Sequence, residues 1–335
     1  MHKIDLNKFE VRTDMILDLE ASKQSYKEDK YKVDDIDVSW IYLGKNNSLN
    51  KKEGIYITIS FDDITDTDSR LKVSNLFCNE FKKLLDKLSY NPNFKTMVIG
   101  LGNPKSTPDA LGPYCVDKII VTNHLFDMNI NVDEKFSKVC AFNPNVTGVT
   151  GIETENYIKG IIDEVKPNLV ILIDALCSSS IKRVNKSIQI TDTGVSPGSG
   201  IGNKRKELSR ETLGIPVIAI GVPTVLDAST IVSDTINYMI KNYAYNKKHI
   251  NSKSSKFINK PVNYLKENSN LSLDDRKKLL GLIGSLNNDE IKLLIKEVLS
   301  PIGYNLIVTP KEVDFEIDKL SEVISYGINH SLNNI

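Results

Sequence analysis

Three short apolar runs that alternate with helical patterns constrain the fold of this chain most strongly. The runs lie at residues 96–101, 169–173 and 216–220. Each is rich in β-branched residues and is apolar on both faces, which is typical of a strand in a sheet that is covered on both sides. The helical patterns lie at residues 111–124, 153–164 and 229–242. This alternation predicts an α/β fold, a three-layer α/β/α sandwich with a mostly parallel sheet.

The rest of the chain is predicted to elaborate this core. Residues 55–61 alternate as a strand does, and residues 71–88 carry apolar side chains at helical spacing. Residues 18–37 are polar without a clear period, so we expect surface structure or a mobile segment there. The stretch 245–270, rich in Lys, Asn and Ser, predicts an exposed linker or insertion. Three amphipathic helical patterns predict a helical C-terminal extension, 271–335, packed on the core.

Composition disfavours several classes of function. The 335 residues include 43 basic and 43 acidic side chains, so bulk charge does not favour a nucleic-acid or membrane-surface binder. The four cysteines have no CxxC spacing and form no cluster with histidines that predicts a zinc site. The charged N-terminus lacks an apolar signal segment, and no run of about 18 apolar residues predicts a membrane span. These features predict a soluble intracellular protein.

Two aspartates follow two of the apolar runs. In open α/β sheets, ligands bind at the carboxyl ends of the strands, so the residues after each run are the first candidates for a site. Asp109 is expected in the first turn of a helix that Thr107 caps, and Asp174 directly follows the second run. Taken singly, each also fits a structural role, as a first-turn acid or a strand-end cap. On one edge of the sheet, the two carboxylates could share a proton, so that one deprotonates water while the other acts as acid.

Other motifs give weaker hypotheses. Asp192 lies in an Asp-Thr-Gly sequence typical of pepsin-like peptidases, but those sites need two such aspartates and an all-β fold. The glycine-rich stretches lack the spacing of phosphate-binding loops. The basic run 203–206 fits a solvated surface or a substrate-facing patch. Cys177 with His124 as its base would make a thiol peptidase, although a small buried cysteine is the commoner case.

Several blocks of the sequence resemble the spore germination proteases of endospore-forming bacteria. The blocks are GLGNPKSTPDALGP, TGIETE, LIDAL, QITDTGVSPGSGIGNKRKEL, ETLGIPVIAIGVPTVLDAST and SPIGYNLIVTPKEVD. The resemblance implies an endopeptidase that degrades the small acid-soluble proteins coating DNA in the dormant spore. It also implies a fold similar to that of the hydrogenase maturation proteases. The catalytic aspartates of this atypical aspartic peptidase fall on Asp109 and Asp174.

Members of the resembled family are made as inactive zymogens that later lose a short N-terminal propeptide. Residues 13–18 match its cleavage pattern of Thr or Ser, an acid, a large apolar residue, two small or apolar residues and a second acid. We therefore expect autoprocessing between Asp14 and Met15, with 1–14 as the propeptide and 15–244 as the peptidase core. The resemblance further implies a homotetramer in the cytoplasm of the forespore and in the spore core. It implies no cofactor and no direct binding of nucleic acid or membrane.

Two alternatives to this mechanism stay open. The same two carboxylates could be ligands in a metal-dependent peptidase, or the fold could hold an acidic peptide without cutting it. The sequence also departs from the family at Asn145, Thr147 and Val149, and at Ser196, where relatives often have His. We expect these departures to alter the wall of the cleft, and with it the preference for particular substrate sequences.

Overall fold

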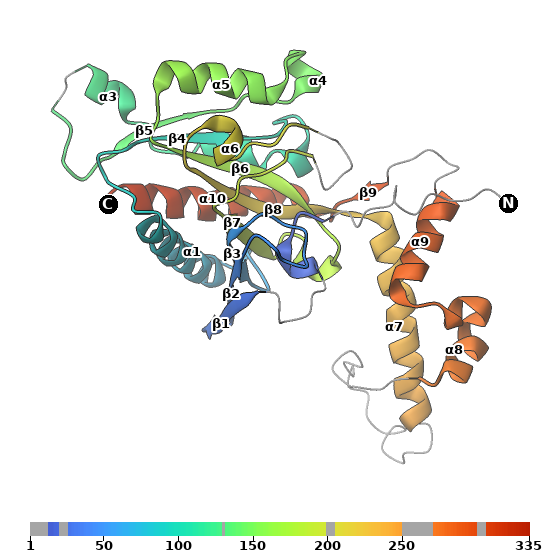
Figure 1. The fold of residues 1–335 in the computed structure, drawn as a ribbon. Helices are drawn as coiled ribbons and strands as arrows, with labels where there is room; N and C mark the ends of the chain where they lie inside the picture. The colour runs from blue at the N-terminus through green and yellow to red at the C-terminus, as the bar shows by residue number, and fades with distance from the viewer. Residues whose placement is uncertain (1–12, 20–25, 129–130, 199–204, 250–270, 300–305) are drawn as a thin grey trace. The chain divides into compact units, whose positions relative to one another are not determined.

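The computed structural model describes residues 13–19, 26–128, 131–198, 205–249, 271–299 and 306–335 (Figure 1). The chain divides into two compact units. The larger unit comprises Arg12–Leu226 and Val308–Ile335, and the smaller unit includes Asp227–Ile307. The segment predicted as a C-terminal extension, 271–335, is therefore divided between the two units.

The larger unit is built on a mixed sheet. The described residues form nine strands in the order β1-β2-β3-β7-β8-β6-β4-β5, with β9 paired to β8. The strands are β1 Lys27–Val33, β2 Ile36–Leu43, β3 Gly54–Ser60, β4 Lys95–Gly100, β5 Lys138–Phe142, β6 Leu169–Ser178, β7 Ser187–Thr191, β8 Val217–Asp227 and β9 Ile307–Val308. The three apolar runs of the sequence form β4, β6 and β8, which are parallel neighbours as predicted.

The expectation of a mostly parallel sheet holds for only half of this sheet. Strand β5 extends the parallel half by pairing with β4. The pairings β1 with β2, β2 with β3, β3 with β7 and β7 with β8 are antiparallel. The missed part includes β1, which falls in the segment expected to be surface structure or mobile. Its side chains are largely exposed on both faces, so the strand shows no apolar alternation.

Helices cover both faces of the sheet, which confirms the predicted three layers. One face packs against α1 Thr67–Lys87, α2 Leu111–Val116 and α10 Val313–Leu332 around a core that includes Phe77, Phe81 and Ile171. The other face packs against α5 Thr154–Val165 and α6 Arg210–Leu213 around a second core. Figure 1 shows α5 above the sheet and α1 with α10 below it. The remaining short helices of this unit are α3 Asn123–Asp127, α4 Thr147–Thr150 and the 3-10 turns Ile16–Asp18, Thr107–Asp109 and Ile181–Arg183.

Two predicted elements differ in length from those observed. The helix expected over 111–124 is interrupted, because α2 ends at Val116 and α3 begins only at Asn123. Strand β6, expected to end at Ile173, continues to Ser178. Residues 174–178 are almost wholly buried but include polar side chains, so an apolar run underestimates the strand. This extension changes the setting of Asp174, which lies within a strand and not beyond it.

The described part of the smaller unit is mainly helical. Helix α7 Ala228–His249 contacts α9 Asn288–Leu299, and α8 Leu273–Leu280 continues into the 3-10 turn Gly281–Ser285. Lys247 of α7 lies 2.6 Å from Asp275 of α8, which joins the two helices by an ion pair. The predicted linker begins inside α7, and its part from 250 to 270 lies outside the described residues. Among the helices that the structure describes, none combines the length and apolarity that crossing a membrane requires.

Candidate active site

Asp109 lies in a 3-10 turn between β4 and α2. Its Oδ2 accepts a hydrogen bond of 2.9 Å from the Asn103 N–H, which comes from the loop directly after β4. The expected helix cap at Thr107 is wrong: Ser106 occupies the N-cap position of the turn and makes no side-chain cap. The Thr224 hydroxyl donates to the Pro108 carbonyl oxygen at 2.6 Å, so β8 also holds the turn. Asn103, directly after β4, thus binds the Asp109 carboxylate, and Thr224 of β8 binds the turn that carries it.

Asp174 lies inside β6, opposite Gly221 of β8. The residue is only 6% exposed, and its Oδ1 accepts a 3.0 Å hydrogen bond from the Ala175 N–H. The side chain of Leu176, also in β6, fills the space at Gly221, where a Cβ atom would lie 2.5 Å from Leu176 Cγ. Sequence reasoning found Asp174 because the apolar run stops abruptly there.

Close packing of glycines brings the two aspartates to one place. A Cβ atom on Gly112 of α2 would lie 2.3 Å from the Leu101 carbonyl oxygen and 2.6 Å from that of Ile173. The Leu101 N–H donates to the same Ile173 oxygen at 2.8 Å. Helix α2 therefore starts directly against the end of β4 and the middle of β6, because residue 112 has no side chain. Asp109, three residues earlier, is thereby held beside Asp174 of β6.

The two carboxylates differ in how strongly they hold a proton. Burial raises the pKa of Asp109 to about 6, although the Asn103 N–H opposes this shift. Burial, the negative charge of Asp109 and the charge of Asp14, in that order, raise the pKa of Asp174 well above its usual value. Both carboxyl groups therefore keep a proton to a higher pH than an ordinary aspartate does, and Asp109 is ionised above about pH 6.

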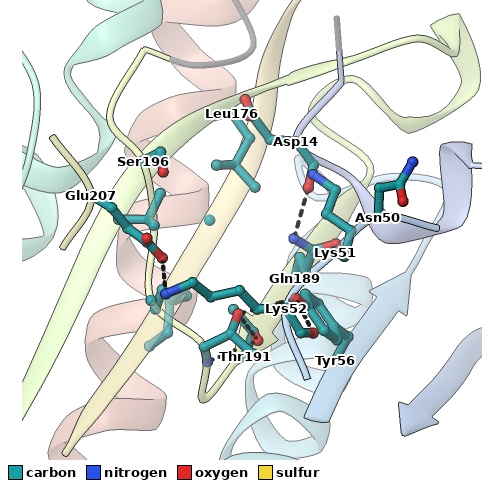
Figure 2. A pocket seen from close by; sticks show the side chains of 16 residues that line it. Asp14, Asn50, Lys51, Lys52, Tyr56, Leu176, Gln189, Thr191, Ser196 and Glu207 are labelled. Carbon is teal, nitrogen blue, oxygen red and sulfur yellow. Dashed lines mark hydrogen bonds and ion pairs between the residues drawn. The ribbon is translucent and has the colours of Figure 1, made fainter. Parts of the chain in front are cut away.

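The N-terminal segment enters this site at Asp14. The Asp14 N–H donates to the Cys177 carbonyl oxygen at 2.9 Å, and the Cys177 N–H donates back to Asp14 Oδ2 at 2.9 Å. Gln189 of β7 contacts the residues that follow. Its Nε2 donates to the Asp14 carbonyl oxygen at 3.2 Å (Figure 2). Its Oε1 accepts from the Ile16 N–H at 2.8 Å. Gln189 therefore clamps the main chain on both sides of Met15, which is fully buried.

Sequence reasoning missed Gln189 as a site residue. Residues 187–191 alternate polar and apolar, which is typical of a half-exposed strand, whereas the structure buries all five. A polar residue in a buried strand needs a hydrogen-bond partner. The partners of Gln189 come from the N-terminal segment, which is distant in sequence.

A cavity of about 240 Å³ opens beside Asp14. Its walls include Lys51, Lys52, Gln189 and Glu207, and Figure 2 shows these side chains around the hollow. Lys52 Nζ lies 2.6 Å from a carboxylate oxygen of Glu207, so this pair closes one side. Among the described residues, neither Asp109 nor Asp174 belongs to the cavity lining, but Gly221, opposite Asp174, does. The cavity therefore adjoins the aspartates and does not contain them.

Comparison with known sequences relates this site to a peptidase family. A family profile described as germination protease matches residues 8–335. The germination protease of Bacillus subtilis (strain 168) is 43% identical over 353 residues, covering 99% of this chain and 95% of the relative. That of Bacillus cereus (strain ATCC 10987 / NRS 248) is 43% identical over 352 residues, covering 98% and 95%. The chain belongs to the germination protease family.

The expected resemblance to germination proteases is thus confirmed over nearly the whole chain. Among solved structures, a NiFe hydrogenase maturation protease, HycI from Thermococcus kodakarensis KOD1, aligns with 39% of this chain and 74% of that chain. The identity is 19% and the TM-score is 0.26, which is too low to support an argument about the site. The three layers rest on the sheet and helices of this protein itself.

The weaker candidate residues of this germination protease have structural roles or lie elsewhere. Asp192 Oδ1 accepts a 2.7 Å hydrogen bond from the Ile55 N–H, which fastens the end of β7 to β3. His124 lies in α3, which contacts β5, whereas Cys177 lies in β6, and β4 separates these two strands. The structure therefore does not favour the thiol pair.

The basic run and the metal alternative can also be compared with the structure. Arg205 lies 3.3 Å from Glu153 and Lys206 lies 2.9 Å from Glu155, while 203 and 204 lie outside the described residues. Ion pairs with α5 thus engage the described part of the run.

Within the portion of the chain that the structure describes, no group of three or more His, Cys, Asp or Glu side chains is arranged to hold a metal ion. Asp109 and Asp174 are the carboxylate ligands that a metal here would use.

Proposed function

We propose that this germination protease is an endopeptidase made as a zymogen, and that it cuts its own chain between Asp14 and Met15. The observation that carries the proposal is the position of Asp14, whose charge raises the pKa of the buried Asp174. The peptide bond predicted from the cleavage pattern thus begins at a residue beside the aspartate pair. The proposed later substrates are the small acid-soluble proteins of the spore. A homotetramer in the spore core is part of the same proposal.

In the proposed reaction, Asp109 is the general base and Asp174 the general acid. The Asp109 carboxylate accepts a proton from water as the water oxygen bonds to the Asp14 carbonyl carbon. Asp174 then gives its proton to the Met15 nitrogen as the carbon–nitrogen bond breaks. One water is consumed, and the proton gained by Asp109 replaces the one that Asp174 gives up. The raised pKa of Asp174, to which the charge of Asp109 contributes, and the pKa of about 6 for Asp109 favour this assignment.

Hydrogen bonds to the main chain support this assignment. The Gln189 amide donates to the Asp14 carbonyl oxygen, where negative charge develops when water attacks. The Met15 N–H, on the nitrogen that leaves, donates to the Thr13 hydroxyl at 3.1 Å. Both atoms of the proposed scissile bond are therefore oriented by fixed partners, which lowers the entropy lost on reaching the transition state.

Mass spectrometry of the full chain tests the function. The unmodified protein is expected to lose residues 1–14, whereas Asp109→Asn and Asp174→Asn are expected to stay intact. Asp192→Asn is the matched control, because Asn retains the oxygen that accepts the Ile55 N–H. Processing by either of the first two variants at the normal rate would refute the aspartate pair. A block only in Asp192→Asn would favour the Asp-Thr-Gly alternative.

A metal-dependent reaction with the same two carboxylates is the second candidate. Its support is the paired oxygen donors, which hard cations prefer. Elemental analysis of the processing-competent protein and its rate after exhaustive chelation separate the two mechanisms. A rate that falls on chelation and returns with one added divalent metal would favour the metal.

A further inference from the structure

The Asp18 side chain is buried together with its charge. It is 1% exposed, and the Arg183 side chain that pairs with it is 25% exposed. Its Oδ2 accepts hydrogen bonds from the Ser178 hydroxyl at 2.8 Å and the Ser179 N–H at 2.7 Å. Its Oδ1 lies 3.2 Å from Arg183 Nε. A buried carboxylate needs such partners, because removing an unpaired charge from water is costly.

Arg183 also contacts the main chain before Asp18. Its NH2 group donates to the Leu17 carbonyl oxygen at 2.8 Å. The guanidinium therefore binds both an acidic side chain and the peptide unit that precedes it. A planar group with several donors suits this double recognition better than a lysine does.

The groups that bind Asp18 directly continue the strand of the proposed catalytic acid. Ser178 is the last residue of β6, which carries Asp174, and Arg183 ends the 3-10 turn that follows. Directly before Ser178 in the chain, Cys177 binds Asp14 through its main chain. Residues 177–183 thus contact both Asp14, directly before the proposed scissile bond, and Asp18, four residues further along the chain.

The N-terminal segment also folds onto itself at this place. The Thr13 hydroxyl donates to Asp18 Oδ2 at 2.6 Å while it accepts the Met15 N–H. A hydroxyl at 13 and an acid at 18 therefore form one recognition unit. This contact gives a physical reason for the Thr or Ser, acid and second acid of the expected cleavage pattern.

We infer that Ser178, Ser179 and Arg183 form the subsite that selects substrates with an acidic side chain at the position corresponding to Asp18. The inference rests on the proposed function and adds the residues that set its specificity. Asp18 fills the subsite in this structure, as a substrate acid does during cleavage in trans. Residues 15–18 stay attached to the enzyme after processing, so they leave the subsite before another substrate enters.

A peptide series on the processed enzyme tests the inference. The substrates are synthetic peptides copying residues 8–22, with Asp, Asn or Lys at the position of Asp18. The Asn peptide is expected to lose about 10- to 100-fold in kcat/KM, and the Lys peptide more, because charged hydrogen bonds in a buried site are lost. This comparison uses the unmodified enzyme, so it does not depend on the folding of a variant.

A second arm assigns the preference to Arg183. In Arg183→Gln both peptides lose the hydrogen bond to the main chain at Leu17, but only the Asp peptide also loses a charged partner. The Asp peptide is therefore expected to slow more than the Asn peptide, so that the preference falls to within about threefold. Lys182→Gln is the matched control: it removes the same charge one residue away, at an exposed position, and should keep the full preference. A purely structural role of Arg183 would slow all peptides equally.

The outcomes separate the inference from the proposed function. Cleavage of all three peptides at equal rates would overturn the subsite and leave the peptidase intact. Failure to cut any peptide, together with a full chain that stays unprocessed, would overturn the proposed function. A preference that survives in Arg183→Gln but disappears in Lys182→Gln would also refute the assignment.

Discussion

At the scale of single residues, the division of one proton between Asp109 and Asp174 determines the expected pH dependence. Burial and the charges of Asp109 and Asp14 raise the pKa of Asp174 well above its usual value, whereas burial raises that of Asp109 to about 6. The proposed base, Asp109, is therefore ionised above about pH 6. The pair resembles an acid and a base in which environment, and not residue type, sets the roles.

The rate of N-terminal processing is expected to rise with pH and to level off above about pH 6. Below that value, each unit of acidification should slow the reaction about tenfold, because only ionised Asp109 accepts a proton. Mass spectrometry of the full chain at a series of pH values measures this rate. A rate that increases as pH falls through 6 would mean that Asp109 is not the base.

Gln189→Glu is expected to slow processing about 100-fold, because a carboxylate cannot donate a hydrogen bond to the Asp14 carbonyl oxygen. Asn50→Asp provides the control: it places the same new charge on the cavity wall, at an exposed position. The rate of mass loss is compared among the two variants and the unmodified chain. Equal rates for Gln189→Glu and the unmodified chain would show that the clamp is not needed for cleavage.

At the scale of elements, the contact of α2 with the end of β4 and the middle of β6 sets the position of Asp109. Gly112 has no unusual backbone angle that demands glycine; only the approach of two carbonyl oxygens requires the missing side chain. A side chain added at residue 112 is therefore expected to change the distance between the two aspartates as well as the stability of the fold.

Gly112→Ala is expected to lower the free energy of unfolding by about 1–3 kcal/mol, because the new methyl group overpacks the contact. Processing should slow further than this loss of stability explains, since α2 and the turn of Asp109 must move. Gly160→Ala, in an exposed turn of α5 with open space around it, should instead gain about 0.5–1 kcal/mol and process normally. Denaturant unfolding and mass spectrometry measure the two effects. Normal processing by Gly112→Ala would contradict this account.

At the scale of the whole molecule, the buried acids of the site reduce the stability of the larger unit at neutral pH. Asp174 has a raised pKa in the folded state, whereas it ionises near 3.8 when unfolded. The unfolded chain then binds fewer protons than the folded chain above that pH, so stability decreases as pH rises toward the folded pKa. Proteins often retain residues that reduce stability where the functional site requires those residues.

Asp174→Asn is expected to raise the unfolding temperature at neutral pH and to have a much smaller effect near pH 4. Asn removes the ionisable group but can still accept the Ala175 N–H, and each kcal/mol gained raises the temperature by roughly 2–4 °C. The fluorescence of Trp40, the single tryptophan, buried in β2, reports on the larger unit. Asp117→Asn, an exposed acid, serves as control and should change little. If Asp174→Asn leaves the unfolding temperature unchanged, the Asp174 carboxyl does not reduce the stability of the larger unit.

The sequence by itself determined the parts of the protein that local patterns encode. Short apolar runs of β-branched residues gave the strands β4, β6 and β8, and the blocks shared with germination proteases gave the family. Asp174 was visible because a charge ends an apolar run abruptly, and Asp109 because it lies between an apolar run and the next helical pattern. The polar edge strand β1 was missed, because its partner and not its own pattern makes it a strand.

Only the tertiary structure decided which distant segments meet. The hydrogen bonds of Asp14 with Cys177 join residues 163 apart in sequence, and those of Ile16 with Gln189 join residues 173 apart. No local period encodes such contacts; they follow from the order in which the strands cross over and pair. The burial that separates the pKa values of Asp109 and Asp174, and the enclosure of Asp18 by Arg183, depend on the same packing. The sequence therefore identified the acids, and the fold assigned each of them its neighbours and its charge.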